Sequence, residues 1–302
     1  MPQSAAPTLA LSIAFVLLWN SGFIGAEFGL EFSGPLTLLF WRYLALSGLL
    51  LAWMLWRAHR LWPGAQAAWQ AGWTGALAHA GWLGFTLGAI ATDVPAGIVA
   101  LIVATQPLLT GALSGPVTGE GTSARQWCGL LIGFVGVAIA VAARLRADDA
   151  APLWGYLLPL GSVAAITVAS LAQRLRATAG AALPMDTLLL YQSFASAAVL
   201  LPLALLLEGL VTTWTPVYIA ALAWVTIPVS LGAYALMWML IARTDATRVA
   251  SLFYFGPPVT MLMAWLAFGD VLKISDLIAL AVTAAGIVLV QWRKRPYAPG
   301  VA

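Results

Sequence analysis

Polar and aromatic side chains with the spacing of a helix face lie inside long apolar stretches of this chain. His79, Trp82 and Thr86 follow one another at i, i+3 and i+7, which places them on one face of a helix. A second face, spaced at i, i+4 and i+8, carries Ser230, Tyr234 and Trp238. Aromatic rings with a few hydrogen-bonding tips suit a small ligand that has a flat apolar part and a polar end. These residues therefore predict reversible binding of such a ligand.

A polar group at membrane depth is costly, so each one needs a partner or a task. This rule selects further candidates in the other apolar stretches. Together, the predicted substrate-binding residues are Asn20, Arg42, His79, Trp82, Gln106, Tyr234, Trp238 and Tyr254. We expect Phe255 in the wall of the same cavity.

Three of these candidates have a structural interpretation beside the binding one. His79 can form a hydrogen-bonded contact between helices, or it can touch a ligand or carry a proton. Arg42 can anchor the fold by pairing with Glu27 or with carbonyls at a helix end, or it can bind a substrate carboxylate. For Gln106 the structural and the substrate-binding interpretations have equal weight.

Proline is expected to interrupt two helices near mid-depth. Pro107 and Pro257 lie at equivalent places about 150 residues apart, and Pro258 follows the second. A proline inside a helix removes one backbone donor and frees carbonyls that the bundle or a cavity must satisfy. The three prolines therefore predict a helix break with a gating role.

The chain lacks the residues of several other kinds of site. No Asp or Glu falls in the middle of an apolar stretch, which excludes the buried carboxylate relay of many proton antiporters. The sequence has no Gly-rich phosphate loop, no metal-ligand cluster and no nucleophile with a nearby base. Its single cysteine, Cys128, excludes an internal disulfide and a cysteine metal site. We expect no cofactor, no metal and no enzymatic activity.

The composition is that of a membrane protein. Apolar residues make up 62% and charged residues 8% of the chain, whereas soluble domains carry roughly a quarter charged residues. Stretches long enough to cross a bilayer core of about 30 Å recur along the whole length. We predict an all-α integral membrane protein with ten transmembrane helices, at roughly 8–27, 34–56, 69–92, 96–117, 125–143, 153–173, 186–207, 216–241, 246–268 and 274–292.

The basic residues predict how these helices are oriented. With the N-terminus in the cytoplasm, the cytoplasmic side carries Arg57, Arg60, Arg125, Arg174, Arg176, Arg243, Arg248, Arg293, Lys294 and Arg295. The opposite side carries only Arg144, Arg146 and Lys273. This bias satisfies the positive-inside rule and predicts that both termini are cytoplasmic. Because the basic residues are dispersed at helix ends rather than clustered, we expect no nucleic-acid partner.

The second half of the chain faintly repeats the first. Pro107, Gly136 and His79 have Pro257, Gly286 and Ser230 as their counterparts about 150 residues later. Ten spans in two copies make five per copy, so the second copy must enter the membrane from the opposite side. We expect a first five-helix repeat at 1–146, a linker at 147–152, and a second, inverted repeat at 153–302 with a short basic tail.

These features resemble the ten-helix branch of the drug/metabolite transporter superfamily, which is built from two EamA-type repeats. The run Trp19-Asn20-Ser21-Gly22-Phe23, with Pro35 and Arg42, resembles the opening of the first repeat. The closing part of the first repeat resembles the family pattern at Pro107, Glu120, Gly129 and Gly136. The second repeat resembles it at Pro257, Asp270 and Gly286. Two positions depart from the family pattern: Glu27 stands where a lysine is common, and Asp270 replaces the more usual glutamate.

The aromatic interior and the run Phe40-Trp41-Arg42-Tyr43 resemble the YddG-type exporters of aromatic amino acids. The resemblance implies a multi-pass protein of the bacterial inner membrane that exports amino acids or related metabolites by alternating access. Its partners would be a small-molecule substrate and the lipid bilayer, and one chain can work as a monomer. Two alternatives are an exporter of hydrophobic cations, drugs or nucleoside-like metabolites, and a membrane enzyme or scaffold without transport.

Overall fold

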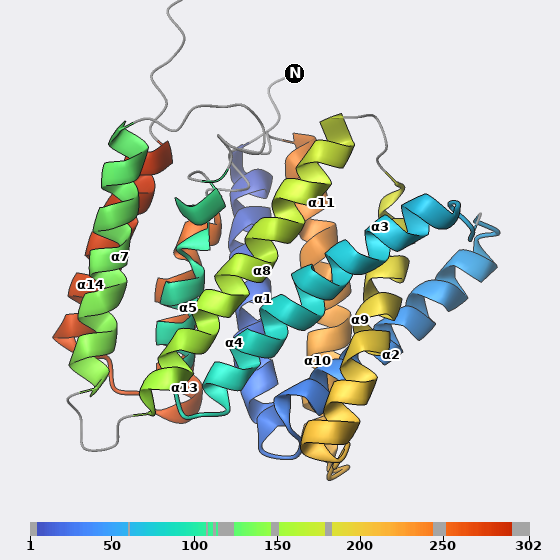
Figure 1. Cartoon of the computed structure of the whole chain (residues 1–302), viewed down its shortest axis with the longest axis horizontal. Helices are drawn as coiled ribbons and strands as arrows, with labels where there is room; N and C mark the ends of the chain where they lie inside the picture. The colour runs from blue at the N-terminus through green and yellow to red at the C-terminus, as the bar shows by residue number, and fades with distance from the viewer. Residues whose placement is uncertain are drawn as a thin grey trace, which may run out of the picture.

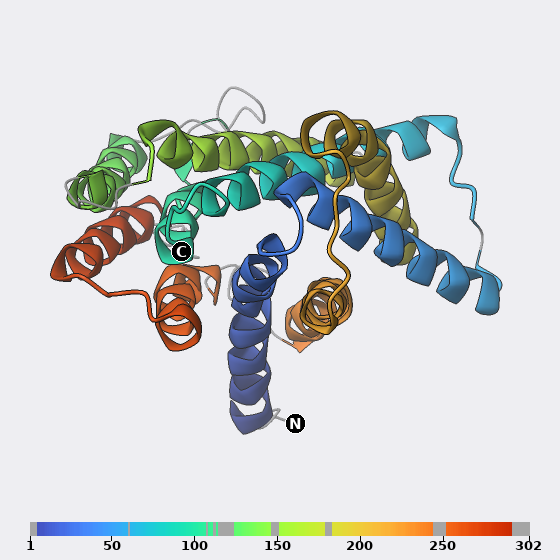
Figure 2. The same cartoon turned by 90° about the horizontal axis from the view of Figure 1, so that it is seen from below.

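The computed structural model describes residues 5–59, 61–106, 108–110, 113, 124–145, 151–178, 183–243 and 252–291. Within these residues the structure is helical, and β structure is limited to one isolated bridge between Ser33 and Thr212. The helices run side by side, roughly from the top to the bottom of Figure 1. Figure 2 shows the same bundle from below.

The helices follow the ten predicted ranges. The first half contains α1 (Ala5–Leu30), α2 (Pro35–Trp56), α3 (Ala65–Gly75), η1 (Ala76–Gly81), α4 (Trp82–Ile90), α5 (Ala96–Val103) and α7 (Ala124–Leu145). The second half contains α8 (Leu153–Thr178), α9 (Met185–Glu208), α10 (Pro216–Trp224), η2 (Val225–Ala233), α11 (Tyr234–Arg243), η3 (Phe253–Phe255), α13 (Gly256–Phe268) and α14 (Ile274–Gln291).

Five helical segments of the described chain are long and apolar enough to cross a membrane. They are Thr8–Leu30, Pro35–Trp56, Leu153–Gln173, Met185–Glu208 and Pro216–Met237. Shorter apolar helices lie at Ala96–Thr110, Trp127–Ala143, Gly256–Phe268 and Ile274–Gly286. The structure thus agrees with a multi-pass membrane protein, while the count of ten crossings and the side of the termini stay predictions.

Two of the long continuous helices contain a π-helical segment. The segment η1 joins α3 to α4, and η2 joins α10 to α11. Pro228 lies inside η2 and cannot donate a backbone hydrogen bond. A π segment inserts an extra residue per turn and changes which side chains face the interior, and such segments are frequent at functional sites. His79 lies in η1 and Ser230 in η2, and both side chains are buried.

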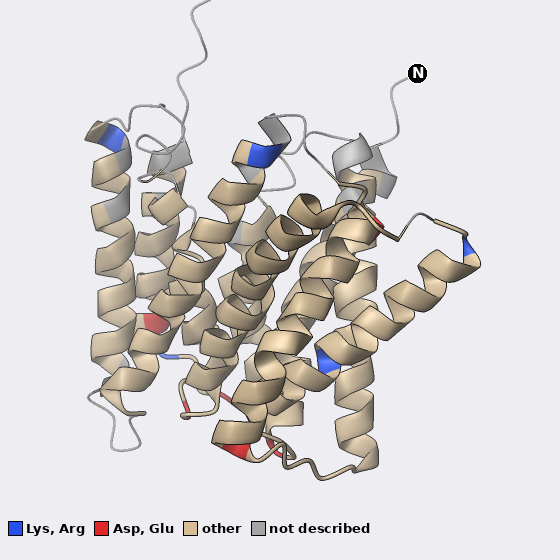
Figure 3. Cartoon of the chain, turned by 45° about the vertical axis from the view of Figure 1, so that its right-hand side comes forward, with Lys and Arg blue, Asp and Glu red and all other residues tan. Residues whose placement is uncertain are grey.

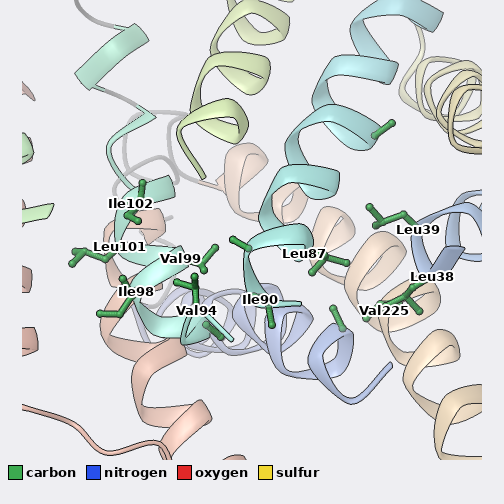
Figure 4. Close-up of a cluster of buried hydrophobic side chains, with 14 of the residues drawn as sticks. Leu38, Leu39, Leu87, Ile90, Val94, Ile98, Val99, Leu101, Ile102 and Val225 are labelled. Atoms are coloured by element: carbon green, nitrogen blue, oxygen red, sulfur yellow. The ribbon is translucent and has the colours of Figure 1, made fainter. Parts of the chain in front are cut away.

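One end of the bundle is filled by apolar side chains. Figure 4 shows this cluster, to which α2 contributes Leu38 and Leu39, α4 Leu87 and Ile90, α5 Ile98, Val99, Leu101 and Ile102, and η2 Val225. These residues come from the beginnings of α2 and α5 and the end of α4. Burial of this apolar surface closes the bundle at that end.

Small residues let α7 and α14 approach closely. A Cβ atom placed on Gly286 would lie 2.5 Å from the backbone nitrogen of Gly133 and 2.6 Å from the carbonyl oxygen of Gly129. One placed on Gly136 would lie 2.7 Å from the backbone nitrogen of Thr283. Such close backbone contact is how helices associate in lipid, where apolar burial between helices gains little.

The first turn of α2 is capped by a residue from another helix. Gly34 precedes this turn and has no side chain to offer its free N–H groups. Glu208, at the end of α9, accepts hydrogen bonds from the backbone nitrogens of Leu36 (3.0 Å) and Thr37 (2.8 Å) and from Thr37 Oγ1 (2.7 Å). A carboxylate at this position also interacts favourably with the positive end of the helix dipole. The contact ties α2 to α9.

The same helix pair is joined at its other end. His59, just past the end of α2, lies with Nδ1 2.6 Å from Oδ2 of Asp186, in the first turn of α9. Oδ1 of Asp186 accepts a hydrogen bond from the backbone nitrogen of Thr187. Polar contacts thus hold α2 and α9 together at both ends.

We predict that Gly136→Ala lowers stability by about 1–3 kcal/mol, because the added methyl group meets backbone atoms of α14 that cannot rotate away. The midpoint of thermal unfolding of the purified protein in detergent measures the effect. Gly48→Ala is the matched control, since no atom lies within 4 Å of a Cβ at Gly48. In a helix that change is expected to leave stability unchanged or raise it, so equal losses in both variants would contradict the α7–α14 packing.

We predict that Glu208→Ala lowers stability by about 1–2 kcal/mol, as the loss of a helix N-cap does. The same thermal midpoint reports this change. Glu31→Ala removes an exposed carboxylate from the same end of the bundle without removing a cap, and it should have little effect. If the two variants unfold at the same temperature, Glu208 does not stabilise α2.

Candidate binding cavity

A cavity of about 410 Å³ lies between the helices of the two halves. Its wall is formed by α1, η1, α4, α5, α8, α9, α11, η3 and α13. Gln173 near the end of α8, Met185 at the start of α9 and Met237 in α11 contribute to this wall. They lie toward the end of the bundle at which α7 begins and α2 and α8 end. In Figure 3 those helix ends carry Lys and Arg at the top, whereas Asp and Glu gather mainly at the bottom.

A second cavity of about 50 Å³ adjoins the first. The large and the small cavity share five lining residues, which are Trp19, Phe23, His79, Trp82 and Tyr234. The small cavity is lined in addition by Arg42, Thr86 and Ser230, and by Leu87 of the apolar cluster in Figure 4. It therefore lies between the large cavity and the closed end of the bundle.

Aromatic rings surround the boundary between the two cavities. The ring of Trp19 stacks on Trp82, with 6.5 Å between centroids, and lies 5.5 Å from the ring of Tyr234. Phe253 meets Trp19 edge to face at 5.0 Å. Rings from four different elements thus provide flat apolar surfaces of the kind that hold an aromatic or aliphatic ligand.

Arg42 lies beside Ser230, not beside Glu27. Its Nε and Nη2 donate hydrogen bonds to Ser230 Oγ at 3.2 and 2.9 Å, and its guanidinium lies 5.6 Å from the ring centroid of Tyr43. Pairing with Glu27, one of the interpretations of Arg42, is therefore not what the structure shows. Arg42 projects from α2 toward η2, whereas Glu27 interacts electrostatically with Asp270 and Glu31.

His79 and Gln192 form a polar pair in the wall of the large cavity. His79 Nε2 lies 3.2 Å from Oε1 of Gln192, and the imidazole packs on the ring of Tyr43 at 5.2 Å. Gly75 makes this approach possible, because a Cβ there would lie 2.5 Å from the Cβ of Gln192. The structure thus shows the helix–helix hydrogen bond that was one of the two interpretations of His79, at a position that also lines both cavities.

Two buried donors in these walls have no hydrogen-bond partner in the described part of the chain. They are Trp82 Nε1 and Gln192 Nε2. A buried donor that lacks an acceptor is destabilising, and such groups in a cavity wall are available to a ligand. Acceptors with negative charge are missing on the protein side, because the described lining of both cavities contains no Asp or Glu.

Two further candidates line the large cavity with their polar groups already engaged. Asn20 Nδ2 donates to the carbonyl of Val16 (2.7 Å), and its Oδ1 accepts from Thr260 Oγ1 (3.1 Å). Gln106 Nε2 donates to Thr110 Oγ1 at 2.8 Å, which leaves its amide oxygen for the cavity. The side chains of Trp238 and Tyr254, and Pro107 as a whole, lie outside the described residues.

The prolines of the second half lie where the helix changes type. Pro257 and Pro258 follow Gly256 in the first turn of α13, directly after the 3-10 turn η3. Pro257 is buried and lines the large cavity. In the first half, α5 ends at Val103, and Ala104 and Thr105 form a turn before the helix resumes. Helix interruptions thus lie close to Pro107 and at Pro257, while their depth in the membrane and their gating role stay predictions.

The sequence interpretation missed some residues of the wall. Phe253 lines the large cavity, whereas Phe255, which was expected there, is 57% exposed. The 3-10 turn explains this error, since three residues per turn instead of 3.6 place side chains on different faces. Spacing placed Ser230 on a helix face with Tyr234, but no sequence signal placed it beside Arg42. The same holds for Trp19 beside Trp82 and for Gln192 beside His79.

Comparison with known proteins finds similarity to membrane transporters. Residues 6–142, in the first half of the chain, match the model of the EamA-like transporter family. A solved crystal structure shares the fold over 95% of this chain and 97% of its own, with a TM-score of 0.65 and 22% identity.

Three relatives match this chain over almost its whole length. It is 28% identical to an uncharacterized inner membrane transporter, YedA, of Escherichia coli (95% of this chain, 92% of the relative). An uncharacterized transporter of Archaeoglobus fulgidus is 27% identical (91% and 93%), and the uncharacterized transporter YvbV of Bacillus subtilis is 26% identical (98% and 95%). These findings support a multi-pass membrane transporter.

We predict that Ser230→Ala lowers stability by about 1–3 kcal/mol, because it removes the hydroxyl that accepts both hydrogen bonds of the buried guanidinium. The readout is the thermal midpoint in detergent without added ligand. Ser47→Ala is the matched control: Ser47 is a buried serine of α2 whose hydroxyl only donates to its own helix, at the carbonyl of Tyr43. A loss no greater than that of Ser47→Ala would show that Ser230 does not hold Arg42.

Proposed function

We propose that the chain exports amino acids or related small metabolites across the bacterial inner membrane, with aromatic amino acids favoured. Ten helices in two inverted repeats, 1–146 and 153–302 joined by 147–152, would carry out alternating access around the two cavities. The rings of Trp82, Tyr234, Trp238 and Tyr254 would hold the apolar part of the substrate. His79, Gln106, Asn20 and Arg42 would hold its polar groups, and Pro107, Pro257 and Pro258 would give the helices their points of bending.

The observation that carries this proposal is the aromatic wall around a cavity of about 410 Å³. Its volume suits a ligand of amino-acid to nucleoside size. Trp19, Trp82, Tyr234 and Phe253 provide flat apolar surface, while hydrogen-bonding groups occur at only a few points of the wall. This combination favours a substrate with one ring and one polar end.

The position of the cavity favours export. The large cavity lies toward the arginine-bearing helix ends, which the positive-inside rule assigns to the cytoplasm. The opposite end is closed by the apolar cluster of Figure 4 and by the Glu208 cap on α2. A substrate would thus enter from the cytoplasm, and the closed end would have to open for release.

The contacts between halves support the proposal of two related repeats. The expected repeat makes α2 equivalent to α9, α5 to α13, and α7 to α14, and each of these pairs is in contact. It also makes η1 equivalent to η2, so the two π segments fall at matching places. Contact between equivalent elements is what a two-fold axis through the centre of the bundle produces.

The lining also argues against one of the alternative substrates, a hydrophobic cation. A hydrophobic cation would be left without a counter-charge, because the described walls contain no carboxylate. The same absence favours a facilitator that is driven by the substrate gradient rather than by protons.

We predict that labelled phenylalanine crosses the membrane of proteoliposomes that contain the purified protein. A pH gradient should change the initial rate little, since the described lining has no carboxylate to carry a proton. Absence of phenylalanine flux with and without the gradient would contradict the substrate. A large acceleration by the gradient would contradict the facilitator mechanism.

Loss of one ring from the wall should weaken transport. We expect Trp82→Ala to raise the concentration for half-maximal flux by about tenfold or more, since a buried aromatic contact of this size contributes 1.5 kcal/mol or more. Trp69→Ala is the matched control, because Trp69 is an exposed tryptophan on α3, far from the lining. Equal flux in both variants would show that the cavity is not the pathway.

A further inference from the structure

Arg42 carries a buried positive charge whose partners among the described residues are all neutral. The residue is only 8% exposed and lies in α2 at the wall of the small cavity. Its partners are the hydroxyl of Ser230 and the ring of Tyr43. A charge removed from water is costly unless it is paired and hydrogen-bonded, and a hydroxyl supplies no counter-charge.

The hydrogen-bonding capacity around this charge is incomplete. Arg42 donates only from Nε and Nη2, so Nη1 has no acceptor among the described residues. Ser230 Oγ already donates to the carbonyl of Val225 and accepts both Arg42 bonds. Trp82 Nε1, in the wall of the same small cavity, is buried without an acceptor. A ligand group with two acceptor oxygens and a negative charge would satisfy these donors.

The volumes of the two cavities indicate what carries that group. The small cavity, about 50 Å³, has room for little more than one carboxylate, since one water molecule occupies about 30 Å³ in the liquid. The rest of the ligand would extend past the shared walls of Trp19, Phe23 and Tyr234 into the large cavity. Gln192 Nε2 offers a further unpaired donor there, on a side chain that is 95% buried.

The net charge of the occupied cavity then distinguishes between classes of carboxylate. A ligand with only a carboxylate group neutralises the positive charge of Arg42, so the occupied cavity carries no net charge. An amino acid brings an ammonium group as well, and the described walls offer it no carboxylate, only amide and hydroxyl oxygens such as that of Gln106. We infer that the preferred substrate is a net monoanion, a carboxylate on an aromatic or aliphatic body without an ammonium group. This inference rests on the proposed transport of amino acids or related metabolites through these cavities, and within that range it prefers the related carboxylate to the amino acid itself.

The test compares three probes of one skeleton on the purified full-length protein in detergent. Isothermal titration at pH 7 measures the Kd of 3-phenylpropanoate, phenylalanine and phenethylamine. We expect 3-phenylpropanoate to bind at least about tenfold more tightly than phenylalanine, and phenethylamine to show no binding. A preference for the amine or for the amino acid would overturn the inference.

Variants show whether Arg42 is responsible. Arg42→Gln should weaken binding of 3-phenylpropanoate by about 30-fold or more, as expected when one partner of a buried charge pair is removed. Arg42→Lys keeps the charge and should lose less. Arg57→Gln is the matched control, since Arg57 ends the same helix outside the cavities and stacks on Trp53. An unchanged Kd in Arg42→Gln would overturn the inference.

Two further measurements apply if Arg42→Gln does not fold or if binding and transport give different answers. If Arg42→Gln does not fold, Trp82→Phe retains a ring but removes the unpaired donor. Both compounds lose some ring contact in this variant, but binding of 3-phenylpropanoate should weaken several-fold more than binding of the neutral 3-phenylpropanol. Equal loss for both compounds would overturn the inference. Proteoliposome flux separates the two proposals: tight carboxylate binding without any flux contradicts transport alone, whereas phenylalanine flux that 3-phenylpropanoate does not compete with contradicts the monoanion preference alone.

Discussion

The bilayer core offers no hydrogen-bond partner to a backbone amide, and most features of this bundle follow from that constraint. Helices satisfy their own backbone groups, so the described chain is helical almost throughout. Where a helix begins or changes type, another group must form hydrogen bonds with the backbone groups that the helix leaves free. Glu208 does this for the first turn of α2. The interruptions at η1, η2 and η3 lie where the chain borders cavities, which is where irregular backbone is tolerated at membrane depth.

The two ends of the bundle differ as expected for a carrier that is open to one side of the membrane only. Apolar packing and the Glu208 cap close the end with the acidic residues, while a cavity of about 410 Å³ lies toward the end with the basic ones. The small cavity, with its guanidinium, lies between them. Under the proposed function, a ligand that reaches Arg42 would have passed the aromatic walls and would lie next to the closed end, which would have to open for release.

Local periodicity predicted the helix ranges and the faces of His79 with Trp82 and of Ser230 with Tyr234, because spacing along one helix is a property of consecutive residues. Local spacing could not predict contacts between segments that are far apart in the sequence. Arg42 meets Ser230 across 188 residues of chain, and no pattern in either segment names the other. Phe255 was wrongly placed because a short 3-10 turn precedes α13 and alters the facing of its residues. The membrane class and the position of the cavity could be predicted; the pairing of its polar groups could not.

The cap on α2 also has a consequence for the order of events during synthesis. Thr37 leaves the ribosome 171 residues before Glu208, its partner. At about 5–20 residues per second this interval lasts on the order of 10 s. Throughout that time the first turn of α2 must be solvated by water or lipid headgroups at the membrane surface. The first turn of α2 therefore gains its cap only after α9 has been made, so the first half of the protein cannot reach its mature form before the first two helices of the second half, α8 and α9, have been synthesised.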